Sequence, residues 1–382
     1  MSTGRIPGAS CRRTRPHISR EIDCARGHVG SRWRVRRKRR GKSTNTGKGR
    51  PQAGGRPGVE ITELVPGIYR VPIPIPAPLR EVNCYAARGR HGWTLVDTGF
   101  HTAAAEEAWR QAFGLLGIRP SDIEAIIVTH FHPDHYGAAG WLQRLSGAPV
   151  YMHDREVAVA RRVWREATVK DLETFAERQA VPGHLRPGLV ERRRQVLSWV
   201  QPQPEVTPVP EGASLAVGDR SFRVLWTPGH TDGLMVLWNE EEGILLANDL
   251  ILGDISPNIS AGPLAAPDPL DRYLASLAKV RELPAVRVLP GHRRPFDDLR
   301  NRCDELRAHH ERRLKDVVDI VRRRGEATGW EVALDLFGPV MNSSANVEFA
   351  LGEAVAHLEY LARRSALTVT DEGGAVRYRL PR

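Results

Sequence analysis

The sequence has little of what marks membrane-embedded or exported proteins. It is 41% hydrophobic over 382 residues, yet no unbroken apolar run approaches the roughly 18 residues of a membrane-spanning helix. Its start lacks the apolar stretch of about 7 to 15 residues and the small-residue cleavage site of a secretory signal. We therefore expect no contact with a membrane and a cytoplasmic location.

Cysteine is scarce as well. The four cysteines, Cys11, Cys24, Cys84 and Cys303, are far apart and form no CxxC pair. This spacing excludes a zinc knuckle and a disulfide-rich secreted scaffold. We expect four reduced thiols.

Positive charge is concentrated at the start of the chain. The net charge is +11, but residues 1–58 hold 17 of the 56 basic side chains and 2 of the 45 acidic ones. This stretch, rich in Arg, Gly, Ser and Pro, cannot bury enough apolar surface to fold, so a disordered basic extension is predicted. It could tether nucleic acid or be a plain solvated segment, and the second interpretation is favoured.

The remaining chain alternates between strand-like and helix-like patterns. Strands are expected over 59–71, 83–85, 93–96, 123–128, 148–152, 222–226, 234–238, 244–247 and 286–289, and helices over 102–116 and 270–283. A charged, helix-prone stretch within 153–203 predicts a helical insertion or lid. This order suits sheets covered by helices.

The character changes after residue 300. Helical patterns over 330–337 and 346–364 follow a long helix, and a β-hairpin is expected over 367–378. Three helices and a hairpin resemble a winged helix, which we assign to residues 301–382. The helix at 346–364 carries several glutamates, which favours packing or dimerisation over phosphate contacts.

Potential metal ligands gather at the ends of the expected strands. His130, His132, Asp134 and His135 lie within six residues, directly after the strand at 123–128. Three further strands lead into His230, Asp249 and His292. Imidazole and carboxylate groups are the ligands that zinc accepts, and the glycines before His230 and His292 permit tight turns. The pattern predicts a metal site.

The order and spacing of these residues, from about Glu60 to His292, resembles the metallo-β-lactamase-fold hydrolase superfamily, particularly its glyoxalase II-like branch. The resemblance implies an α+β fold over residues 59–300. This is an αββα sandwich, two β-sheets packed face to face with helices outside and the metals at one edge.

The resemblance also implies roles for individual residues. One metal ion would be held by His130, His132 and His230, the other by Asp134, His135 and His292, with Asp249 bridging them. Asp97 resembles an early aspartate that orients a ligand, although an ordinary turn aspartate is an equal alternative. Asn248 stands where the family often has glycine.

Two departures narrow the branch. Position 132 is histidine where the di-iron flavoprotein branch has glutamate, which disfavours redox chemistry. Position 249 is aspartate, not the cysteine of the best-known zinc β-lactamases. An exported antibiotic-degrading enzyme is therefore a poor fit.

The expected chemistry is hydrolysis by a hydroxide that bridges two divalent metal ions. Zinc is the expected metal, and manganese or iron could fill the same ligands. Asp134 would coordinate and orient the hydroxide as the catalytic carboxylate. Tyr136 could donate a hydrogen bond to substrate or simply pack.

The leading hypothesis is cleavage of a thioester or related activated ester. The expected partner is a small-molecule substrate, and the sequence is compatible with a homo-oligomer. One alternative is a phosphodiesterase or endoribonuclease on RNA, with Arg161, Arg162 and 192–194 near the phosphates, although these could be a solvated helix face. Another is a nucleic-acid-binding module with a structural metal.

Overall fold

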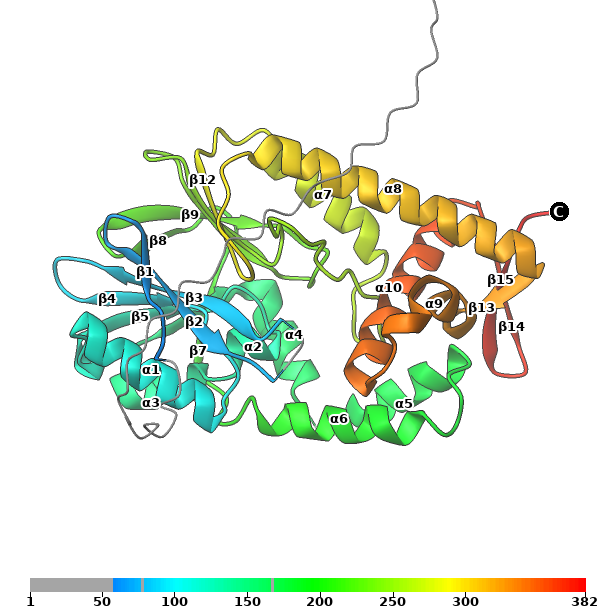
Figure 1. Cartoon of the computed structure of the whole chain (residues 1–382), viewed down its shortest axis with the longest axis horizontal. Coiled ribbons are helices and arrows are strands. Elements are labelled where there is room, and N and C mark those ends of the chain that lie inside the picture. Colours follow the sequence, from blue (N-terminus) through cyan, green and yellow to red (C-terminus); the bar gives the residue numbers. More distant parts are fainter. Residues whose placement is uncertain (1–57, 77–78, 166–167) are drawn as a thin grey trace, which may run out of the picture. The chain divides into compact units, whose positions relative to one another are not determined.

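The computed structural model describes residues 58–76, 79–165 and 168–382 (Figure 1). Apart from Gly58, the extension predicted for residues 1–58 lies outside them. In the described part of the chain, no helix has both the length and the apolar character needed to span a membrane.

The first sheet has seven strands within the described residues, in chain order. They are β1 (Thr62–Val65), β2 (Ile68–Pro74), β3 (Glu81–Arg88), β4 (Trp93–Val96), β5 (Ile123–Ile127), β6 (Val150–His153) and β7 (Val206–Val209). Pairings from β1 to β4 are antiparallel, whereas those from β4 to β7 are parallel. The sheet is therefore mixed.

The second sheet has the strand order β12-β11-β10-β9-β8. Its strands are β8 (Ser214–Val217), β9 (Arg220–Trp226), β10 (Met235–Asn239), β11 (Ile244–Asn248) and β12 (Arg287–Pro290). Pairings from β8 to β11 are antiparallel, and the pairing of β11 with β12 is parallel.

Helices cover the outer faces of both sheets. Between β4 and β7 in the chain lie α1 (Ala103–Leu116), η1 (Pro120–Asp122), α2 (Pro133–Tyr136), α3 (Ala139–Ser146), α4 (Asp154–Val163), α5 (Thr168–Arg178) and α6 (Arg186–Ser198). We call α4, α5 and α6 the lid helices. The helix α7 (Pro269–Arg281) packs on the second sheet, on the far side from α1 and α3 (Figure 1).

Strand alternation explains the layers, because consecutive side chains point to opposite faces of a sheet. Leu95 packs outward with Trp109 of α1, whereas the next residue, Val96, faces the second sheet. Leu246 meets it from that sheet, and Leu245 packs outward with the core beneath α7. The expected two-sheet sandwich with helices outside is confirmed.

The C-terminal segment combines helices with a small sheet. It contains α8 (Leu299–Arg324), β13 (Glu326–Thr328), α9 (Gly329–Phe337), η2 (Gly338–Val340), α10 (Ser344–Arg363), β14 (Thr368–Glu372) and β15 (Ala375–Arg379). The strand order is β13-β15-β14. The helix α10 contacts α6, α7, α8 and α9, so this segment packs on the lid helices and on the sandwich.

Local signals placed most elements correctly. The predicted cap of the first helix is present, since Thr102 Oγ1 accepts a hydrogen bond from the Ala105 amide at 3.2 Å. The short strands β7, β8 and β13 were not expected. β7 is a half-exposed edge strand of four residues containing Pro208, and proline weakens a strand signal.

Candidate metal centre

The seven predicted ligands lie together at one edge of the sandwich, where strands end. The first four, His130, His132, Asp134 and His135, occupy the turn after β5 and the short helix α2, while His230 follows β9, Asp249 follows β11 and His292 follows β12. Chain segments from both sheets thus converge on one site.

Within the described residues, three groups of side chains place their ligand atoms within 4.8 Å of one another. The groups are His130, His132 and His230; His130, His135 and Asp249; and Asp134, His135 and His292. The first and third groups are the two triads that the sequence resemblance implied.

Asp249 lies between these two triads. Its Oδ2 is 3.6 Å from Nε2 of His230, in one triad. The same oxygen is 3.5 Å from Nε2 of His135 and 3.5 Å from Nε2 of His292, in the other. A single carboxylate oxygen is therefore placed where a bridging ligand would be.

The ring nitrogens that face away from the site have their own partners. Nδ1 of His135 contacts Asp97 Oδ2 at 2.7 Å, and Nδ1 of His230 contacts the Asn258 carbonyl at 2.8 Å. Nδ1 of His292 contacts the Glu81 carbonyl at 3.0 Å. Such contacts fix the ring and its tautomer, and they leave Nε2 as a metal ligand.

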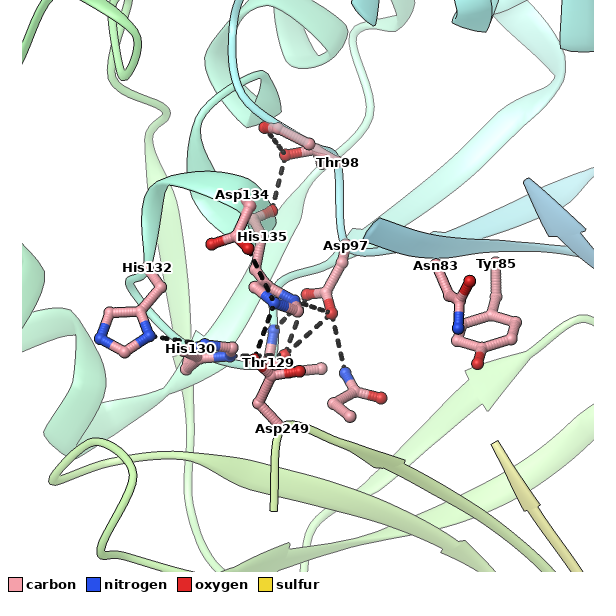
Figure 2. A network of polar contacts seen from close by, with 12 residues as sticks. Asn83, Tyr85, Asp97, Thr98, Thr129, His130, His132, Asp134, His135 and Asp249 are labelled. Atoms are coloured by element: carbon pink, nitrogen blue, oxygen red, sulfur yellow. Dashed lines mark hydrogen bonds and ion pairs between the residues drawn. The ribbon is translucent and has the colours of Figure 1, made fainter. Parts of the chain in front are cut away.

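Asp97 is fully buried and binds three neighbours at once (Figure 2). Its Oδ1 accepts from the Thr129 amide at 2.9 Å, and its Oδ2 contacts His135 and accepts from Asn248 Nδ2 at 2.8 Å. Of the two interpretations offered for Asp97, this geometry matches the residue that orients a ligand.

Backbone conformation explains two unusual residues. Asp97 and Asn248 have positive φ angles of 59° and 43°, a region that aspartate and asparagine enter more readily than other side chains. Asparagine tolerates this conformation at position 248. It adds a hydrogen bond to Asp97 that glycine could not make.

The two glycines of the ligand turns serve different needs. Gly229 has a φ of 139°, and a Cβ there would lie 2.4 Å from Tyr273 Cα. At Gly291 a Cβ would lie 2.2 Å from Asp249 Oδ1 and 2.9 Å from His135 Cε1. Gly291 is thus required by the close approach of two ligands, not by its own backbone angle.

The end of β12 is tied to the other sheet. The Pro290 carbonyl accepts hydrogen bonds from Tyr85 Oη at 2.6 Å and from Asn83 Nδ2 at 2.9 Å, both on β3. The Asn83 amide donates to the Gly291 carbonyl at 2.7 Å. These bonds hold the turn that carries His292 against the first sheet.

The two ends of the cluster differ in protonation, because the carboxylates attract positive charge strongly enough to outweigh burial at His135 and His292 but not at His132. Burial lowers the pKa of His132 to about 3, so this imidazole is neutral at pH 7. Burial opposes ionisation of Asp134, but His135 and His292 hold its pKa at about 2. Against burial, Asp249 and Asp134 raise the pKa of His292 to about 10. A cation that binds here must displace protons, so its binding tightens as the pH rises.

The donor set fits divalent metal ions. Nε2 of His135, Nε2 of His230 and Oδ1 of Asp249 are buried and have no hydrogen-bond partner among the described residues. Leaving buried polar atoms unpaired is costly unless another partner satisfies them. Imidazole nitrogens and carboxylate oxygens turned inward in this way are the ligands that zinc and similar ions take.

Glu156, on α4, joins two of the ligand turns and was not anticipated. Its Oε1 accepts from the Phe131 amide, between His130 and His132, and its Oε2 accepts from the Gly233 amide, both at 2.7 Å. The carboxyl group is fully buried, which raises its pKa to about 7. In sequence it is one glutamate in a charged helix, so no local signal marks it.

We expect Glu156→Gln to weaken zinc binding roughly 10- to 100-fold, the usual effect of losing a group that supports metal ligands. Glutamine offers one acceptor oxygen where two amides now donate, so one ligand turn loses its anchor. Zinc affinity is measured by competition with a chromophoric chelator. Asp154→Asn, at an exposed position of the same helix turn, is the control. Equal affinities for wild type and both variants would contradict this role.

Tyr136 belongs to the core. Its side chain is 3% exposed and stacks at 6.4 Å on Trp164, and it does not line the cavity beside the ligands. The packing interpretation holds for this residue, and donation to substrate is not supported.

The fold and the clusters define a class of protein, a metallo-hydrolase built on an αββα sandwich. The family model of the metallo-beta-lactamase superfamily matches residues 77–292. A second model, of the metallo-beta-lactamase-like C-terminal domain, matches residues 314–381. The chain therefore belongs to the metallo-beta-lactamase superfamily.

Relatives span nearly the same length. The chain is 26% identical to the "Probable metallo-hydrolase YqjP" of Bacillus subtilis, over 82% of this chain and 97% of the relative. The chain is 36% identical to a metallo-beta-lactamase family protein of Thermus thermophilus, whose crystal structure matches with a TM-score of 0.76. The match covers 84% of this chain and 100% of that one. A beta-lactamase domain protein of Burkholderia ambifaria is 28% identical, with a TM-score of 0.75, covering 84% and 94%.

Proposed function

We propose that this chain is a dinuclear, zinc-dependent hydrolase of thioesters or related activated esters, similar to the glyoxalase II-like branch. The observation that carries the proposal is the pair of triads on either side of Asp249, one of three histidines and one of two histidines and an aspartate. In this proposal His130, His132 and His230 hold one ion, and Asp134, His135 and His292 the other.

Two ions held there would polarise the ester carbonyl and lower the pKa of a water toward neutrality. The chain's own residues do the rest. Asp134 lines the cavity and stays ionised at neutral pH, so it can accept a hydrogen bond from the attacking water and orient it. Asp97 and Glu156 hold the ligand turns in place.

The RNA alternative gains less support, because at least three of the five arginines suggested for phosphate contacts have partners within the chain. Arg162 Nη2 donates to the Leu264 carbonyl at 2.6 Å, and Arg193 Nη2 donates to the Val163 carbonyl at 2.6 Å. Arg192 Nε lies 3.9 Å from a carboxylate oxygen of Glu348.

The element order α8, β13, α9, α10, β14, β15 supports a winged-helix type of domain at the C-terminus. We assign it a packing role. Glu353 of α10 accepts from Asn258 at 3.2 Å, and Glu359 accepts from the Asp268 amide at 3.1 Å. These contacts engage α10 with the loop after Asp249 instead of leaving it for phosphates.

We expect purified full-length protein to bind about two zinc ions and to cleave a butanoyl thioester, because two triads are available. Metal content is measured by mass spectrometry. Turnover is measured before chelation, after chelation and after zinc is added back. The control substrate is a nitrophenyl phosphodiester. Phosphodiester cleavage without thioester cleavage would favour the RNA alternative. Bound metal with turnover of neither substrate would favour the binding module, and the absence of both metal and turnover would contradict the proposal.

A further inference from the structure

A cavity of about 510 Å³ opens from the predicted metal ligands, within the usual range for small-molecule sites. His132, Asp134, His230, Asp249 and His292 lie at one end of it. It extends between the lid helices and α10, so the C-terminal segment forms one of its walls.

The lid side of this cavity is aliphatic and aromatic. Two apolar side chains come from each of the helices α4, α5 and α6: Val159 and Val163 from α4, Leu172 and Phe175 from α5, and Leu189 and Val196 from α6. Such a surface binds apolar groups by removing them from water.

The wall from α10 continues this surface. Leu351 is 2% exposed, whereas Phe349 is 45% exposed, an unusual exposure for so large an apolar side chain. An apolar ligand in the cavity would cover part of that ring. Apolar surface of this kind around a reactive site marks where a ligand binds.

Charged residues at the cavity are matched by partners. Arg192 lies near Glu348, and Arg272 is paired with Asp232. Arg193 stacks over Trp164, 4.9 Å from the ring centroid, and donates to Thr168 Oγ1 at 3.0 Å. Two of these three arginines thus face a carboxylate and the third is held by neutral side chains, which does not suit a polyanion in the interior.

We propose that the cavity binds the acyl group of the substrate and that this group is large and apolar, an aliphatic or aromatic acyl chain well beyond acetyl. This inference rests on the proposed thioester hydrolysis. The water oxygen bonds to the carbonyl carbon, the carbon–sulfur bond breaks, and the sulfur leaves as a thiol with a water proton. The substrate carbonyl lies at the end of the cavity with the metal ligands, and the acyl chain extends under α5 and α6.

The test is a series of N-acetylcysteamine thioesters from acetyl to dodecanoyl, hydrolysed by zinc-loaded full-length protein. We expect kcat/KM to rise by up to about fourfold per methylene until the cavity is filled, as each buried methylene adds apolar contact. Acetyl turnover equal to or faster than octanoyl turnover would overturn this inference alone. Failure to cleave any member would overturn the proposed function with it.

A matched pair of variants tests where the acyl chain of the substrate lies. Val196 lines the cavity, whereas Val190 lies on the same helix outside it. We expect Val196→Phe to lower kcat/KM for decanoyl thioester roughly tenfold or more, equivalent to two methylenes displaced, and to shorten the preferred chain. Val190→Phe should leave the series unchanged. A decanoyl preference that survives in Val196→Phe would place the acyl group elsewhere.

Discussion

Replacing Asp249 with alanine should empty the metal centre and lower kcat/KM by roughly a thousandfold or more. One carboxylate oxygen of Asp249 lies within 3.6 Å of imidazole nitrogens from both triads. In the proposed dinuclear centre, its removal takes the shared ligand from both ions. Metal ions contribute several kcal/mol to such transition states, and each 1.36 kcal/mol is tenfold in rate. Metal content and thioester turnover measure the effect.

Asp254→Ala is the control for this prediction. Asp254 lies in the loop after Asp249, but its side chain is exposed to solvent. We expect it to keep both the metal content and the turnover of wild type. An Asp249→Ala protein that retained two metals and near-normal turnover would remove Asp249 from the centre.

Replacing Gly291 with alanine should be nearly as damaging, although glycine has no functional group. The new methyl carbon would lie 2.2 Å from Asp249 Oδ1 and 2.9 Å from His135 Cε1, so at least one ligand must move. Displacing catalytic groups by about 1 Å can cost roughly a hundredfold in rate. We expect a loss of that order in kcat/KM, together with weaker zinc binding.

Gly114→Ala is the matched control, because Gly114 lies in α1 with nothing within 4 Å of the added carbon. In a helix, alanine is favoured over glycine by about 1 kcal/mol, so this variant should unfold at a slightly higher temperature with unchanged activity. If both variants bound zinc as wild type does, the close approach at Gly291 would not be needed to position the metal ligands.

The sequence was most informative about the metal ligands, because clustered histidines and aspartates at strand ends have one dominant role. Four ligand-type side chains between His130 and His135, directly after a β-branched run, predicted the first ligand turn. Strand-like runs before His230, Asp249 and His292 predicted the others. The run before Asp249 forms β11, which is buried on both faces, so its apolar character was strong.

What the sequence could not provide were contacts between distant segments. Glu156 supports Phe131 and Gly233, but it reads as a solvated helix residue until the fold brings them together. The same holds for the hydrogen bond between Asn248 and Asp97, which are 151 positions apart. Gly291 predicted a tight turn, whereas its requirement comes from Asp249 and His135. Such needs depend on tertiary geometry, not on periodicity.

The attachment of β12 to β3 has a consequence for how the protein is made. The Pro290 carbonyl bonds to Asn83 and Tyr85, partners 207 and 205 positions earlier in the chain. A growing chain that lacks β12 has neither this attachment nor His292, so one of the two ligand triads is incomplete. Contacts between such distant residues form slowly. The group of Asp134, His135 and His292 is therefore completed late in synthesis, whereas His130, His132 and His230 all precede β12.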